Sequence, residues 1–391
     1  MNPSFHIIDF VIVGIYAILL VGVGLWVSRT KKGHTKTAED YFLASKALPW
    51  WAIGSSLIAA NISAEQFIGM SGSGFAGGLA IASYEFMAAL TLIIVGKFFL
   101  PIFIKQGIYT IPEFVEKRFS TNLKTILAVF WIALFVFVNL TSVLFLGGKA
   151  IDTIVGVGDG SMIVPAIIAL AIFAAAYSLY GGLSAVAWTD VIQVALLVIG
   201  GIITTLIALH YVTPDGGILN GISHIADAAS DKFDMVLSRD NKEFNNLPGI
   251  YVLIGGLWVA NLYYWGFNQY IIQRTLAAKS LTEAQRGIAF AAFLKMLIPF
   301  IVVIPGIVAW VMYSEDLYGA RSAFEIAGST ALNNDNAYPW LISTFIPVGV
   351  KGLVLAALAA AIVSSLASML NSTSTIFTMD IYKPYINREA S

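Results

Sequence analysis

One stretch of this chain reads Ala356-Ala-Leu-Ala-Ala-Ala-Ile-Val-Ser-Ser-Leu-Ala-Ser-Met-Leu-Asn-Ser-Thr-Ser-Thr375. Its small and hydroxyl-bearing positions 361, 364, 365, 368, 372 and 375 recur at steps of three and four, so they share one face of a helix. Hydroxyl and backbone oxygens, with no thiol or imidazole among them, suit a hard cation. The same pattern also suits close helix packing in lipid or hydroxyls bonded to their own turn. Taken alone, this helix leaves these explanations open.

The composition around this helix is that of a polytopic, all-α membrane protein. Of the 391 residues, 58% are hydrophobic and 12% are charged, and the mean hydropathy is +0.81. About 20 apolar residues cross a bilayer as a helix, and these runs are too long for barrel strands. The absence of cysteine excludes disulfides and thiolate metal sites. We expect nine membrane spans in a single domain, 1–391, at 7–28, 49–75, 80–104, 125–148, 162–180, 186–211, 248–272, 287–313 and 348–378.

The positive charges predict the orientation of these spans. Four stretches, 29–46, 105–124, 274–286 and 379–391, carry 14 of the 22 Lys and Arg residues. Cytoplasmic loops are enriched in these residues. We therefore expect a multi-pass membrane protein with the N-terminus outside and residue 391 on the cytoplasmic side.

Polar residues interrupt two of the spans. The span 49–75 contains Asn61-Ile-Ser-Ala-Glu-Gln66, and the span 248–272 contains Asn261-Leu-Tyr-Tyr-Trp-Gly-Phe-Asn-Gln269. In transporters, paired interrupted helices at matching places in two repeats mark the binding site. Because the first repeat, 49–211, has five spans, the second starts from the opposite side of the membrane. This predicts a five-plus-five inverted repeat with an extra first helix, 7–28, and a second repeat, 248–378, truncated after three spans.

Charges inside these spans need a reason, because each costs about 2.5–3.5 kcal/mol on insertion scales. Five such residues stand out: Glu65, Glu85, Lys97, Asp190 and Lys295. Lys97 and Asp190 lie near the predicted inner ends of their spans. Glu85 and Lys295 lie in mid-span and either form a structural ion pair or hold the hydroxyls of a polar ligand. Similarly, Tyr263-Tyr-Trp265 either stacks on an apolar sugar face or packs between helices.

Five short motifs carry further information: Tyr41-Phe-Leu-Ala-Ser-Lys-Ala-Leu-Pro-Trp-Trp51, Ile58-Ala-Ala-Asn-Ile-Ser-Ala-Glu-Gln-Phe-Ile-Gly69, Tyr180-Gly-Gly-Leu-Ser-Ala185, Trp188-Thr-Asp190 and Ser364-Ser365. They resemble motifs of the sodium/solute symporter family, and of its sugar-transporting branch in particular. The resemblance implies a leucine-transporter-like fold and a place in the bacterial inner (cytoplasmic) membrane. It also implies a sodium ion between the second and ninth spans, with Asp190 on the inner sodium route. The sodium ligands that it implies are the carbonyls of Ala59, Ile62 and Ala361 and the hydroxyls of Ser364 and Ser365.

The same resemblance implies a sugar site at the helix breaks. Its ligands would be Gln66, Glu85, Asn261 and Lys295, with Asn61 nearby. Tyr264 would form the inner gate, and Met70 and Tyr84 would belong to the outer lid. Ala88 stands where the resemblance leads us to expect a hydroxyl residue, and the last core helices would add a further sugar ligand and part of the lid.

These observations predict sodium-driven symport of a neutral hexose, galactose or glucose, by alternating access. The expected partners are sodium, the sugar and the lipid bilayer, and no nucleic acid. Two alternatives stay open: a sodium symporter for an amino acid or an organic acid, and a transporter-like sensor domain. We do not expect an enzyme, because no nucleophile or acid–base pair with an oriented partner is evident.

Overall fold

The computed structural model describes residues 6–29, 36–63, 65–155, 160–247, 249–326 and 328–389. Regular structure among them is helical, apart from two isolated bridges. Six of the described helices are long and apolar enough to cross a membrane, or seven if one bent pair around Gly255 is counted. The protein is therefore an all-helical, multi-pass membrane protein.

Helices of the first half cover the expected spans up to residue 211. Their bounds are α1 Ile7–Val27, α2 Ala38–Phe42, α3 Trp50–Asn61, α4 Ser71–Gly77, α5 Ser83–Ile94, α6 Leu100–Gln106, α7 Ile111–Arg118, α8 Thr121–Leu134, α9 Thr141–Val155 and α10 Ile163–Tyr211. The expected spans 162–180 and 186–211 both lie in α10, which kinks at Gly182 (φ 58°). Only glycine fits there, because a Cβ would lie 2.3 Å from the carbonyl oxygen of Tyr41.

Helices of the second half include both long spans and short segments. Their bounds are α11 Ile218–Ala228, α12 Ile250–Ile254, α13 Gly256–Leu262, α14 Gln269–Leu276, α15 Leu281–Ser314, α16 Ala320–Phe324, α17 Ala337–Phe345 and α18 Val350–Ile376. The hydroxyl-rich stretch lies in α18. In its apolar window 83% of the residues are buried, against 17% for α1, so α18 is a central helix and α1 a peripheral one.

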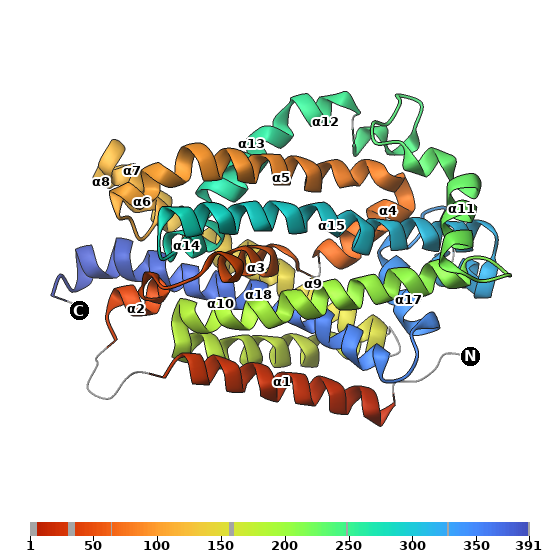
Figure 1. Cartoon of the computed structure of the whole chain (residues 1–391), viewed down its shortest axis with the longest axis horizontal. Coiled ribbons are helices and arrows are strands. Elements are labelled where there is room, and N and C mark those ends of the chain that lie inside the picture. Colours follow the sequence, from red (N-terminus) through yellow and green to blue (C-terminus); the bar gives the residue numbers. More distant parts are fainter. Residues whose placement is uncertain are drawn as a thin grey trace.

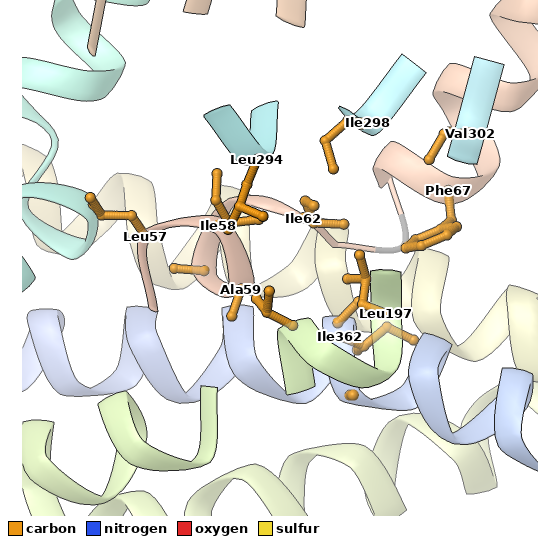
Figure 2. Packing of buried hydrophobic residues seen from close by; sticks show 14 of the residues in the cluster. Leu57, Ile58, Ala59, Ile62, Phe67, Leu197, Leu294, Ile298, Val302 and Ile362 are labelled. Carbon is orange, nitrogen blue, oxygen red and sulfur yellow. The ribbon is translucent and has the colours of Figure 1, made fainter. Parts of the chain in front are cut away.

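The first interruption lies where its polar run predicts. Helix α3 ends at Asn61, Ile62 is extended (φ −80°, ψ 110°), and a π-helical turn, Glu65–Met70, leads into α4. Side chains from α10, α15 and α18, among them Leu197, Leu294 and Ile362, surround this break (Figure 2). A non-helical turn is therefore held inside the protein, away from lipid.

The second interruption lies later in the sequence than the polar run suggests. The chain is helical through Asn261 and through a π-helical turn, Tyr263–Phe267, and it becomes extended at Asn268 (φ −80°, ψ 122°) before α14. Our expectation that Asn261 lies in the break was wrong. Its amide donates to the carbonyl of Leu257 at 3.0 Å, within its own helix.

The two ends of the helix bundle differ in what they carry. Helices α2, α7 and α14 and the C-terminal end of the chain lie at the left end in Figure 1, and α11 and α17 lie at the right end near the N-terminus. The Lys- and Arg-rich stretches 105–124, 274–286 and 379–391 therefore gather at one end. The stretch 30–35 lies outside the described residues.

Candidate functional site

A polar cavity of about 560 Å³ lies beside the first helix break. It is lined from both sides of that break, from α5, from the π-helical turn Phe135–Leu140 with α9, from the second broken span and from α18. The lining residues are Ala60, Asn61, Ser63, Gln66, Met70, Ser73, Ile81, Tyr84, Val138, Asn139, Ser142, Val143, Tyr264, Tyr270, Ser365 and Met369. Both sides of the break and the hydroxyl face of α18 thus meet at one hollow.

Backbone oxygens converge on Ser365 at the edge of this cavity. The Ser365 hydroxyl lies 3.0 Å from the carbonyl oxygen of Ala60, 3.5 Å from that of Ile62 and 3.1 Å from that of Ala361. The end of α3 leaves its last carbonyls without partners in the helix and carries the negative end of the helix dipole. Four oxygens and a negative helix end make a cluster that fits a hard cation.

Ser364 and Asp190 lie directly behind this oxygen cluster. The Ser364 hydroxyl donates to Asp190 Oδ1 at 2.5 Å, and both residues are fully buried. The structure thus brings four of the five residues implied as sodium ligands to one place, together with Asp190. Ala59, the fifth, is packed beside them with 1% of its surface exposed (Figure 2), and it is the neighbouring Ala60 whose carbonyl reaches Ser365.

Glu85 and Lys295 form a buried ion pair close to the cavity. Lys295 Nζ lies 2.5 Å from Glu85 Oε2, and its ammonium lies 5.3 Å from the centre of the Trp265 ring. Gln66, which lines the cavity, donates from Nε2 to Glu85 Oε1 at 2.9 Å. Because the two charges cancel, this side of the site is polar and neutral.

Three side chains close the cavity on the side of the second break. Asn61 donates from Nδ2 to the Tyr264 hydroxyl at 2.9 Å, and the Tyr270 hydroxyl donates to the same oxygen at 2.8 Å. Tyr264 therefore joins the first broken span to the second. On the opposite side, Met70 and Tyr84 line the cavity, and Tyr84 also lines an outer recess with Glu243 and Asp335.

Two acceptor atoms among the cavity-lining side chains have no hydrogen-bond partner among the described residues. They are Asn61 Oδ1 and Gln66 Oε1, both buried. A buried carbonyl oxygen without a donor costs free energy unless a ligand or water supplies one. Their placement suits a ligand that carries hydroxyl donors.

The structure places the other sequence candidates as follows. Asn261 is buried in α13, and its amide nitrogen bonds within its own helix. Ala88 is buried on α5, one helical turn from Glu85. Lys97 is exposed, and the side chain of Glu65 lies outside the described residues.

Sequence reasoning missed Tyr270, Gln273 and Arg274. We counted Arg274 as a charge of the inner loop, but it is fully buried in α14 and lies 3.5 Å from Asp190 Oδ2. That count was wrong because a buried partner on α10 balances the charge. The one available signal was the position of Arg274 directly after the apolar run that follows the second break.

Comparisons with known proteins show the family to which this chain belongs. The model of the "Sodium:solute symporter family" matches residues 41–391. A "Sodium/glucose cotransporter" of Vibrio parahaemolyticus is 65% identical over 98% of this chain and 70% of its own length. The human "Sodium/myo-inositol cotransporter" is 33% identical over 98% of this chain and 55% of its own length. This chain thus spans little more than half of that human relative.

A solved structure shares the fold. It is described as a substrate-bound outward-open state of a Na⁺-coupled sialic acid symporter, and it superposes with a TM-score of 0.83 at 28% identity. The match covers 98% of this chain and 76% of that one. The helical architecture described above is therefore the architecture of that symporter.

Proposed function

This chain belongs to the sodium:solute symporter family, and we propose that it moves a neutral hexose, glucose or galactose, into the cell together with sodium. The observation that carries this proposal is the position of Ser365. Its hydroxyl lies within the oxygen cluster at the first helix break and also lines the polar cavity. A cation at the cluster and a solute in the cavity would therefore bind side by side. The name of the Vibrio relative, which is 65% identical, supports the same pairing.

We infer that sodium binds between the end of α3 and the hydroxyl face of α18. Ala59, Ile62 and Ala361 would supply carbonyl oxygens there, and Ser364 and Ser365 hydroxyls. Bound sodium would hold α3 and α18 together at the break. It would thereby keep Asn61 and Gln66, which line the cavity there, in position.

The sugar would occupy the cavity, with Gln66, Glu85, Asn61 and Lys295 at its polar side and Asn261 nearby. The unpartnered acceptors Asn61 Oδ1 and Gln66 Oε1 suit sugar hydroxyls. Because the charges of Glu85 and Lys295 already balance each other, the site offers no free charge to an ionic substrate. This favours a neutral polyol over an amino acid or an organic acid.

Alternating access follows from the two sides of the cavity. Tyr264, held by Asn61 and Tyr270, would act as the inner gate. Met70 and Tyr84, which line the opposite side of the cavity, would form part of an outer lid. We place the Lys- and Arg-rich end of the bundle, at the left in Figure 1, in the cytoplasm. Each broken span would then be the first helix of one repeat in an inverted five-plus-five arrangement. Helix α1 would be an extra helix, and the second repeat would be partial, over 248–378.

The membrane potential can drive this cycle. One sodium crossing 100 mV supplies about 2.3 kcal/mol, which accumulates an uncharged sugar about fiftyfold. The test is uptake of labelled sugars by cells that produce the whole protein, with an inward gradient of sodium or of potassium. We expect glucose or galactose uptake with sodium alone, and no competition from a sugar acid. Equal uptake in the two gradients, or preferred uptake of the acid, would contradict the proposal.

A further inference from the structure

Helix α14, which follows the second break, buries three polar side chains that the proposed sugar site does not use. Gln269, Gln273 and Arg274 each have 0% of their surface exposed. Gln269 bonds to the backbone at the start of α7: its Oε1 accepts from the N–H of Ile111, and its Nε2 donates to the carbonyl of Tyr109. Gln273 and Arg274 instead face the helices that carry the proposed sodium site.

Gln273 fastens α14 to the far half of α18. Its Nε2 donates to Asn371 Oδ1 at 3.0 Å and to Thr375 Oγ1 at 2.9 Å, and its Oε1 accepts from Ser372 at 2.8 Å. Nε2 also lies 2.7 Å from the carbonyl oxygen of Phe42, the last residue of α2. The Gln273 side chain therefore links the end of α14 to α18 and to the segment that precedes α3.

Arg274 reaches three further helices from the same end of α14. Its Nε donates to Ser56 Oγ on α3 at 2.6 Å, and its Nη2 donates to Ser368 Oγ on α18. The same Nη2 lies 3.5 Å from Asp190 Oδ2 on α10. A buried arginine needs such partners, because an unpaired charge at this depth is costly.

Asp190 links Arg274 to the proposed sodium ligands. One carboxylate oxygen accepts from Ser364 and the other from Ser56, each at 2.5 Å. Ser364 precedes Ser365, whose hydroxyl lies in the oxygen cluster. The contacts thus run without a gap from the cluster through Ser364 and Asp190 to α14.

We propose that Arg274 is a positioning residue that couples closure of the inner side to sodium binding; the inference rests on the proposed function. With α14 docked, the guanidinium balances Asp190, and Ser364 stays oriented toward the cluster. When α14 swings away to open the inner side, Asp190 loses this partner. The bound sodium is then the nearest cation able to balance it, so inner opening draws sodium off the cluster toward the cytoplasm.

A purely structural role predicts something different. Packing of α14 needs only shape and satisfied hydrogen bonds, and buried ion pairs are often replaceable by apolar residues without loss of stability. If Arg274 instead couples sodium binding to the position of α14, sodium bound on one side of Asp190 must change how often α14, on the other side, becomes exposed. The readout must therefore be the effect of sodium on the exposure of α14, since stability alone does not separate the two roles.

The absence of cysteine in this chain makes a labelling experiment direct. Thr275 is buried on α14, and its hydroxyl bonds only within its own helix, to Ile272, so Thr275→Cys reports exposure of α14. A membrane-impermeant maleimide is applied to the cytoplasmic face, with sodium or potassium chloride, and each rate is normalised to the unfolded chain. In the Thr275→Cys parent we expect sodium to slow labelling about tenfold, within the usual range of coupling between sites.

Three variants in this background separate the roles. The first variant is Arg274→Met. The second adds Asp190→Asn, which removes the unpaired buried charge and so guards against misfolding. Both should label fast, at a rate that sodium no longer changes. Gln269→Leu is the matched control: it is equally buried on the same helix but bonded away from α18. It should label faster than the parent and still be slowed by sodium.

The outcomes are distinct. If sodium still slows labelling of the pair Arg274→Met with Asp190→Asn, the proposal is overturned. It is also overturned if Gln269→Leu loses the slowing by sodium as completely as Arg274→Met does. If sodium does not protect the parent but raises its melting temperature, sodium binds and the coupling through Arg274 is refuted. If sodium affects neither labelling nor melting of the parent, the proposed sodium site falls as well.

Discussion

At the scale of single residues, the position of Ser365 matters more than its chemistry. Nearly every hydroxyl on α18 bonds to its own helix or to a neighbour, as Thr373 does with the carbonyl of Met369. Ser365 differs because carbonyls from the end of α3 approach the same oxygen from outside the helix. The Ser365 hydroxyl also lies 3.1 Å from the carbonyl oxygen of Ala361 in its own helix, so back-bonding and the proposed cation binding involve the same oxygen.

The substitution Ser365→Ala should remove one cation oxygen and leave the helix intact, since alanine is a good helix former. We expect sodium affinity to fall about tenfold or more, because the cation loses one oxygen ligand and a polar contact with a charged group contributes about 1.5–3 kcal/mol. Thr373→Ala is the matched control on the same helix, and its sodium affinity should be unchanged. The measurement is equilibrium binding of radioactive sodium to purified protein; equal affinities in the two variants would contradict the assignment.

The ion pair between Glu85 and Lys295 predicts an asymmetric pattern of stability. Lys295→Met leaves a buried carboxylate without its partner and should lower the free energy of unfolding by about 3–5 kcal/mol. Adding Glu85→Gln removes that charge and should restore most of the loss. Thermal unfolding in detergent measures both, and a double variant as unstable as Lys295→Met alone would show that the charges do not interact.

Glu85→Gln alone tests the sugar site. It keeps the size of the side chain and one acceptor but unbalances Lys295. We expect hexose affinity to fall at least tenfold, because hydrogen bonds to charged groups contribute about 1.5–3 kcal/mol. Sodium affinity measured without sugar should stay close to that of the parent. Hexose binding at parental affinity would place the sugar elsewhere.

At the scale of elements, the start of α18 depends on a residue from the other end of the sequence. The helix begins after Gly349 without a side-chain cap of its own. Asp9 Oδ1 on α1 instead accepts from the backbone N–H groups of Gly349 and Gly352, at 2.8 Å each. Asp9 is fully buried, and its carboxylate faces the positive end of the helix that carries Ser365.

Asp9→Ala should therefore destabilise α18 from its start. We expect a loss of about 1–2 kcal/mol in the free energy of unfolding, the usual cost of a lost cap. Asp9→Asn keeps an acceptor oxygen and should lose less. Ile18→Ala, on the exposed face of the same helix, should change stability by less than about 0.5 kcal/mol. If Asp9→Ala costs no more than Ile18→Ala, the cap contributes nothing.

At the scale of the whole molecule, composition and periodicity were enough to predict an all-helical membrane protein with two broken spans. Periodicity located the break after Asn61, because the polar run that starts there interrupts an otherwise apolar span. It misplaced the second break, since the aromatic residues 263–267 continue the helix as a π-helical turn. The local sequence pattern cannot show which of several polar residues ends a helix, because the hydrogen-bond partners of those residues lie on other helices.

The candidate site shows the same limit. The hydroxyl stripe singled out Ser364 and Ser365, and charge inside predicted spans singled out Glu85 and Lys295. The structure pairs Glu85 with Lys295 and with Gln66. Arg274 could not be recognised, because its role depends on Asp190, which lies 84 residues earlier in the sequence. Long-range pairing of buried charges is a property of packing, and one sequence alone does not contain it.

The central claim is that sodium and a neutral hexose bind to adjoining sites and strengthen each other. Linkage requires the two effects to be equal: sodium must raise hexose affinity by the same factor as hexose raises sodium affinity. Equilibrium binding of labelled galactose or glucose across sodium concentrations, and of radioactive sodium across sugar concentrations, measures both factors on one preparation. We predict one shared factor of about tenfold or more in the parent, falling to about one in Ser365→Ala. Hexose affinity independent of sodium in the parent would contradict the claim.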